Sequence, residues 1–123
     1  MQNNNWIDYK IEIKERLKSF SLQILQLSGK IPVSISGKVI NYQITKSGTS
    51  MYANFRSALR ARSKAEFFSK LSIAVEETDE TEMWLDLILS SGIVKDESVV
   101  QLHLESIELL RILSRMRKRI AKD

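Results

Sequence analysis

The chain lacks cysteine and contains little proline or glycine. Its 123 residues include no Cys, one Pro and four Gly. Without cysteine, disulfide bonds and thiolate-ligated metal sites are excluded. Because few residues favour tight turns, the composition argues against a sheet protein rich in hairpins and favours a small number of long helices.

Signals for membranes and secretion are also missing. No uncharged apolar run approaches the roughly 18 residues of a membrane span, and no cationic segment followed by an apolar one marks a signal peptide. The sequence therefore predicts a cytoplasmic protein with no membrane partner. Because 43% of the residues are hydrophobic and 28% charged, we predict a single globular domain over residues 1–123, with residues 1–5 disordered.

The residue sets that carry catalysis or bind metals are absent as well. His103 is the only histidine, so the acidic cluster between Glu76 and Glu82 has no Glu-x-x-His pair to complete a di-metal site. The sequence contains no glycine-rich phosphate loop and no nucleophile–histidine–acid set. We therefore predict no catalytic residue, no metal site and no cofactor, and hence a non-enzymatic protein.

The strongest helix signal covers residues 63–91. Ser63 and Glu66 form a capping box at its start, and Gly92 follows it as a C-cap. Between these caps, apolar or small residues recur at alternating spacings of four and three, which places them on one face of a helix. This predicted core stripe consists of Phe67, Leu71, Ala74, Thr78, Thr81, Leu85 and Ile88.

Three other segments show the same spacing, over about residues 6–27, 36–59 and 98–120. In the second segment, Ser-Gly-Thr-Ser at residues 47–50 is a poor helix former, so the segment is either one kinked helix or two helices, and we favour the kinked helix. Four helices with three short links predict an all-α, up-down-up-down antiparallel four-helix bundle. The three stripes are Trp6, Lys10, Ile13, Leu17, Phe20, Ile24 and Leu27; Ile40, Ile44, Ser47, Met51, Asn54 and Ala58; and Val99, Leu102, Ser106, Leu109, Leu113, Met116 and Ile120.

Charge is distributed unevenly along the chain, whose net charge is +4. Residues 1–62 hold ten Lys or Arg and three Asp or Glu. Residues 63–97 hold three Lys or Arg and nine Asp or Glu, and residues 98–123 hold six Lys or Arg and three Asp or Glu. The predicted topology also gathers cations at one end, because the starts of the first and third helices lie beside the ends of the second and fourth. This basic pole consists of Lys10, Arg56, Arg60, Arg62, Lys64, Arg115, Arg117, Lys118, Arg119 and Lys122.

The basic pole is the predicted site for nucleic acid. Phosphate groups are bound by Lys and Arg side chains clustered on one surface. Alternatively, these cations only stabilise helix C-termini and keep the protein in solution. Because no recognition-helix motif is present, sequence-specific reading is not expected. The candidate phosphate contacts are Arg56, Arg60, Arg62, Lys64, Arg115, Arg117, Lys118 and Arg119.

A second stripe of the acidic helix contains Glu77, Glu80 and Trp84. In one interpretation it is a half-buried flank whose carboxylates pair with basic residues of neighbouring helices. In the other, Trp84 anchors an interface between subunits. The bundle topology places Glu77 near Arg111 and Glu80 near Lys46.

Residues 50–88 also carry a pattern similar to that of a known family. Its elements are Ser50-Met51-Tyr52-Ala53-Asn54, Ser63, Glu66-Phe67, Leu71-Ser72-Ile73-Ala74, Glu77, Glu80-Thr81 and Trp84-Leu85. The pattern resembles the four helix bundle protein family, first noticed as proteins encoded in intervening sequences of large-subunit ribosomal RNA genes.

This resemblance implies a bacterial or phage-like bundle without enzymatic activity that assembles as a homopentamer. A more distant similarity to accessory proteins of diversity-generating retroelements implies binding to RNA or DNA and to a reverse transcriptase. The resemblance supports the fold more strongly than the function, because one fold serves many functions. The alternative function is a protein-interaction scaffold with no nucleic-acid role.

Overall fold

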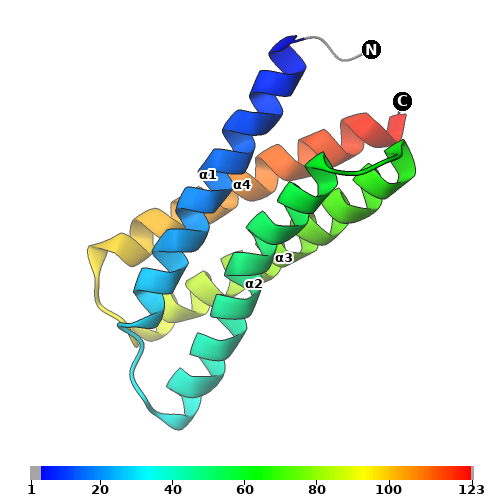
Figure 1. The fold of residues 1–123 in the computed structure, drawn as a ribbon. Helices are drawn as coiled ribbons and strands as arrows, with labels where there is room; N and C mark the ends of the chain where they lie inside the picture. Colours follow the sequence, from blue (N-terminus) through cyan, green and yellow to red (C-terminus); the bar gives the residue numbers. More distant parts are fainter. Residues whose placement is uncertain (1–3, 123) are drawn as a thin grey trace.

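The computed structural model describes residues 4–122, which form four antiparallel helices and, within that range, no strand (Figure 1). The helices are α1 (Asn4–Ser28), α2 (Ile35–Leu59), α3 (Lys64–Ser91) and α4 (Glu97–Lys122). The all-α four-helix bundle predicted from the sequence is confirmed. One boundary is corrected: α1 begins at Asn4, so Asn4 and Asn5 are helical rather than disordered, while residues 1–3 lie outside the described residues.

The helices do not contact their neighbours equally. The most extensive contact is between α2 and α3, followed by α3 with α4 and α1 with α2. Contacts between α1 and α4 are sparse, and Figure 1 shows these two helices diverging toward the ends of the chain. As a result, the bundle is closed near the α1–α2 and α3–α4 links and open between α1 and α4 at the other end.

The predicted stripes form the core. In α3, every stripe residue from Leu71 to Ile88 is buried, and in α1 every one from Lys10 to Leu27. The α2 stripe is corrected, because the structure buries Phe55 and leaves Asn54 and Ile40 half-buried. The amide of Asn54 donates a hydrogen bond to the Ser50 carbonyl oxygen at 3.0 Å, which satisfies this polar group on its own helix.

The ends of α3 have the predicted caps. Ser63 Oγ accepts a hydrogen bond from the Glu66 amide at 3.1 Å, and Gly92 adopts the left-handed conformation with a φ of 69°. Each such N-cap stabilises its helix by about 1 kcal/mol. The Ser63 cap fixes where α3 begins, and thereby the position of its first turn at the basic pole.

Residues 47–50 belong to α2, which continues through them as one helix, so the alternative of two helices is excluded. Small side chains there permit close packing on both sides. A Cβ at Gly48 would lie 2.9 Å from Cγ2 of Ile24 in α1, and Ser21 of α1 donates a 2.7 Å hydrogen bond to the Gly48 carbonyl oxygen. On the other side, the hydroxyl oxygens of Ser47 and Thr81 lie 2.8 Å apart in a buried hydrogen bond between α2 and α3.

Candidate nucleic-acid interface

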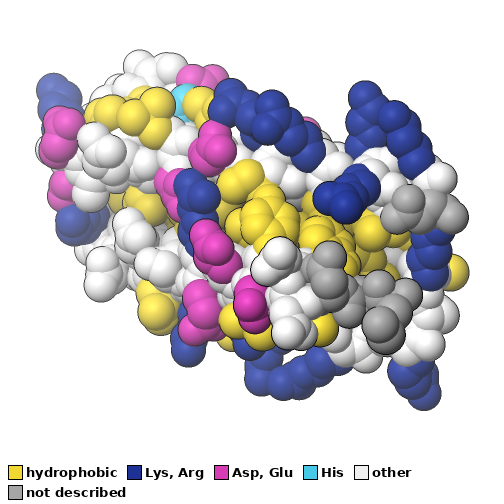
Figure 2. Space-filling view, turned by 90° about the horizontal axis from the view of Figure 1, so that it is seen from above, with side chains coloured by type: hydrophobic (Ala, Val, Ile, Leu, Met, Phe, Trp, Pro, Cys, Tyr) yellow, Lys and Arg dark blue, Asp and Glu magenta, His cyan; other side chains and the backbone are white. Residues whose placement is uncertain are grey.

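The N-terminal ends of α1 and α3 and the C-terminal ends of α2 and α4 meet at one end of the bundle (Figure 1). A single pocket there is lined by residues of α1, α2, α3 and α4, including Lys10, Leu59, Lys64 and Ile120. The structure thus brings the basic helix ends together. Figure 2 views the molecule from above and shows Lys and Arg side chains around an apolar area on one half, with Asp and Glu gathered on the other half.

Arg56 and Arg60 lie on the α1 side of the basic pole. They line a surface hollow of about 360 Å³ together with Lys10 and Lys14 of α1. Both arginines are exposed. This side of the pole therefore gathers cationic side chains of α1, of the last turn of α2 and of its C-cap around one depression.

Arg117 and Lys118 lie on the α3 side, where they line a second hollow beside Phe68. The Arg117 guanidinium carbon is 5.5 Å from the centroid of the Phe68 ring. Arg119 makes an equivalent contact across the opening, with its guanidinium carbon 5.5 Å from the Trp6 ring centroid. A ring contact orients a guanidinium while leaving its N–H donors available for anions.

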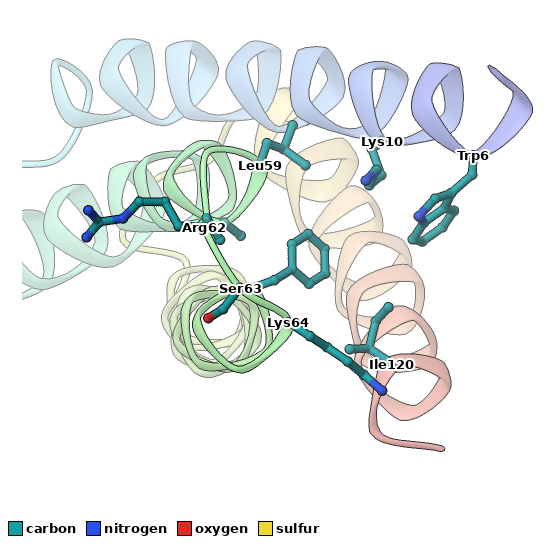
Figure 3. A pocket seen from close by; sticks show the side chains of 10 residues that line it. Trp6, Lys10, Leu59, Arg62, Ser63, Lys64 and Ile120 are labelled. Carbon is teal, nitrogen blue, oxygen red and sulfur yellow. The ribbon is translucent and has the colours of Figure 1, made fainter. Parts of the chain in front are cut away.

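The remaining candidates are more dispersed. Lys64 lines the pocket shared by the four helices, and Figure 3 shows its side chain extending toward Ile120 of α4. Arg62 also borders this pocket, but Figure 3 shows its guanidinium directed away from it. Arg115 and Lys122 are exposed on α4.

Apart from Lys10, the cations of the basic pole form no ion pair with an acidic side chain of residues 4–122. Among residues 4–122, ion pairs occur only away from this pole. They join Arg16 to Glu105, Lys30 to Asp96, His103 to Glu82 and Arg111 to Glu108. Within the described residues, the cations without an ion pair include Arg56, Arg60, Arg62, Lys64, Arg115, Arg117, Lys118, Arg119 and Lys122.

Sequence reasoning missed the aromatic component of this site. Trp6 and Phe67 were assigned to core stripes, yet both are only half-buried and both line the shared pocket. They are the first members of their stripes and lie at the end of the bundle where α1 diverges from α4. The position of an aromatic residue in the first turn of a helix, at the start of its stripe, is the sequence signal that could have indicated this.

The second predicted site, on α3, is arranged differently from expectation. Arg111 forms its ion pair with Glu108 on its own helix at 2.6 Å, and within residues 4–122 it has none with Glu77. The pKa of Glu77 is raised, first by burial and then by Glu80, while Lys46 of α2 opposes the shift. Lys46 is therefore the cation that acts on Glu77. The sequence predicted that Lys46 would pair with Glu80, but the two form no ion pair among the described residues.

Trp84 is half-buried against the core, and its indole Nε1 has no hydrogen-bond partner within residues 4–122. On the next helix, His103 Nε2 and Glu82 Oε2 lie 2.7 Å apart and connect α4 to α3. No three His, Cys, Asp or Glu side chains of the described chain are grouped to hold a metal ion. None of its helices is long and apolar enough to span a membrane.

The model of one protein family, 23S rRNA-intervening sequence protein, matches residues 9–115. The chain belongs to this family. This member of the 23S rRNA-intervening sequence protein family is a four-helix bundle. The family resemblance found in the sequence is confirmed. Trp6 and residues 117–119 lie outside the matched range, so the family match does not extend to this part of the basic pole.

A solved structure supports the same assignment. It is a protein of unknown function from the S23 ribosomal protein family of Bacteroides thetaiotaomicron, 32% identical in sequence with a TM-score of 0.78. The similarity covers 89% of this chain and 97% of the other. Among curated proteins, none matches this chain.

Proposed function

We propose that this member of the 23S rRNA-intervening sequence protein family is a non-enzymatic protein that binds nucleic acid through its basic pole. The observation that carries the proposal is the set of Lys and Arg side chains at one pole, of which nine form no ion pair with the described residues. Each contact with a phosphate releases condensed counterions, so unpaired and exposed cations favour binding. Binding to RNA or DNA inside the cell would place the protein in the cytoplasm.

The contacts of the guanidinium groups add to this support. Arg117 lies on Phe68, and Arg119 lies on Trp6. These rings hold two long side chains at the surface and reduce the side-chain entropy lost when an anion binds. These donors would contact the phosphate backbone, which is the same for every sequence, and the sequence has no recognition-helix motif. We therefore expect little sequence preference.

The proposal includes self-association. Exposed apolar side chains recur along the outer faces of two helices, and large exposed apolar faces commonly mark interfaces. The family resemblance implies a homopentamer, and such an assembly would multiply the number of basic poles available to one strand. The exposed apolar residues are Ile7, Ile11, Leu22 and Leu25 on α1, and Val100, Leu104 and Ile107 on α4.

The decisive test combines charge reversal with salt titration. A variant with Arg117, Lys118 and Arg119 each changed to Glu should lose at least about tenfold in affinity for an RNA or DNA oligonucleotide, and should flatten the plot of log affinity against log salt by roughly 0.7–0.9 per lost phosphate contact. The matched control changes Lys18, Lys38 and Lys95 to Glu, which alters the net charge equally at exposed positions away from the basic pole. Equal losses in both variants, or none in either, would contradict the proposal.

The exposed face of α4 favours a second candidate function, a scaffold for a protein partner. Val100, Leu104 and Ile107 lie on one side of this helix, with Leu104 56% exposed. The resemblance to retroelement accessory proteins suggests a reverse transcriptase as such a partner. A partner that binds equally well at low and high salt, and is lost when Leu104 is changed to Glu, would support this function instead.

A further inference from the structure

The pocket shared by the four helices at the basic pole, here called the aromatic pocket, has a distinct composition. Its volume is about 450 Å³, and all four helices contribute to its lining (Figure 3). Two aromatic rings and several aliphatic side chains line it beside polar and cationic groups, among them one lysine from α1 and one from α3. The residues used below are Trp6, Lys10, Leu59, Lys64, Phe67 and Ile120.

Trp6 is held in place from several sides. Its ring stacks on Tyr9, with centroids 6.0 Å apart and an angle of 25° between the planes. Arg119 of α4 lies 5.5 Å from the same ring, on the far side of the opening between the helices. Figure 3 shows Trp6 and Lys10 projecting from α1 toward Lys64 and Ile120.

Lys10 connects the two aromatic residues of the pocket. Its Nζ is 5.1 Å from the Trp6 ring centroid and 5.5 Å from that of Phe67. The side chain is only 9% exposed, and burial lowers the pKa of its ammonium group. The Lys10 ammonium therefore lies between two π surfaces, and Lys64 brings a second ammonium to the same pocket.

This combination matches the chemistry of a nucleotide. A nucleobase has a flat π surface that stacks on aromatic side chains, donors and acceptors at its edge, and an attached phosphate that requires cations. In a duplex the bases are stacked and paired, so only a single strand, a loop or an end can place a base in a pocket. Phosphate contacts alone would not need aromatic walls.

We propose that the aromatic pocket accepts an unstacked nucleobase of single-stranded nucleic acid. The base stacks on Trp6 in place of the Arg119 guanidinium, or on Phe67 in place of the Lys10 ammonium. Lys10 then donates a hydrogen bond to the edge of the base, and Lys64 and Arg119 contact the adjoining phosphates. The inference rests on the proposed function and adds a substrate class to it, because it makes the protein select single strands over duplexes.

The test uses the fluorescence of Trp6. The chain contains two tryptophans, so changing Trp84 to Phe leaves Trp6 as the only one. This variant is titrated with a short RNA oligonucleotide of mixed sequence and, separately, with the same oligonucleotide annealed to its complement. We expect the single strand to quench Trp6 and to bind more tightly than the duplex.

Affinity measurements then separate stacking from charge. Changing Trp6 to Leu should weaken single-strand binding roughly five- to hundredfold, the contribution of one stacked base, while duplex binding stays unchanged. Trp6→Phe should retain most of the affinity. Tyr42→Leu is the matched control, because Tyr42 is an aromatic residue of α2 that is 65% exposed and does not line the aromatic pocket.

The outcomes distinguish this inference from the proposed function. If Trp6→Leu folds poorly by circular dichroism, Phe67→Leu removes the other π surface and takes its place. Equal binding of single strand and duplex, unaffected by either variant, would overturn the inference and leave the proposed function intact. No binding of either RNA would overturn the proposed function. Binding of an acidic aromatic peptide that depends on Trp6, without binding of RNA, would overturn both.

Discussion

Arg16 of α1 and Glu105 of α4 form a two-point ion pair although 89 positions separate them in the chain. The Nε–Oε2 and Nη2–Oε1 distances are both 2.7 Å. The pair lies where α1 still approaches α4, before the two helices diverge toward the basic pole. The pair also raises the pKa of Arg16, and the hydrogen bond that Arg16 donates to Glu105 is the largest cause.

We predict that this pair contributes measurably to stability. The two side chains are 38% and 29% exposed, so each single change to Ala should lower the free energy of unfolding by about 1 kcal/mol, and the double change should cost little more. Urea denaturation of the wild type, the two single variants and the double variant measures the coupling free energy between the two side chains. The more exposed pair of Arg111 with Glu108, one turn apart on α4, is the control and should contribute below about 0.5 kcal/mol.

Replacing Gly48 by Ala should destabilise the bundle. Alanine gains helix propensity of about 1 kcal/mol, but its Cβ would lie 2.9 Å and 3.0 Å from the two γ carbons of the buried Ile24. Relieving that overlap in a packed core costs about 1–3 kcal/mol, so the net change is a loss. Gly29→Ala is the control, because a Cβ at Gly29 would contact only the carbonyl oxygen of Gln26, at 3.5 Å. A thermal midpoint for Gly48→Ala at or above that of the wild type would contradict the close packing.

Glu77 should limit stability at neutral pH. Because its folded-state pKa is raised, the folded protein binds this proton more tightly than the unfolded chain, and stability falls as pH rises from the ordinary Glu pKa through the folded value. Glu77→Gln should therefore stabilise the protein at pH 7 by less than about 1 kcal/mol and have no such benefit in acid. Unfolding curves at both pH values test this. A loss of stability at pH 7 would indicate that a cation from another subunit pairs with Glu77.

Self-association should depend on the outer face of α4. Light scattering should give a mass that is a multiple of 14.2 kDa, and Leu104→Glu should shift it toward the monomer because a charge cannot be buried there without a partner. Lys95→Glu, an exposed change just before α4, is the control and should leave the mass unchanged. A wild-type mass of 14.2 kDa at micromolar concentration would contradict the proposal of an oligomer.

The sequence predicted the helices well because their evidence is local. Caps such as Ser63 and Gly92 and the spacing of four and three depend only on residues within a few turns. The same reasoning failed between Asn54 and Phe55, where two neighbouring residues fit the stripe and only the packing against the other helices decides which is buried.

Pairing between helices was harder to predict. Topology alone placed Arg111 near Glu77, yet Arg111 bonds to Glu108 one turn away, because a partner on the same helix requires no particular register between helices. The pair of Arg16 with Glu105 depends on the register and tilt of α1 against α4. The aromatic pocket likewise results from the divergence of these two helices, which no spacing along the chain encodes.

The sparse contact between α1 and α4 also determines how the molecule opens. Because α1 is attached mainly through α2, we expect its N-terminal half to detach while α2, α3 and α4 stay packed. In hydrogen exchange, the amides of this half of α1 should therefore exchange through a local opening of lower free energy than global unfolding. A strand that bridges Trp6 on α1 and Lys64 on α3 would slow their exchange, so amide protection in one helix would report occupancy of the pole.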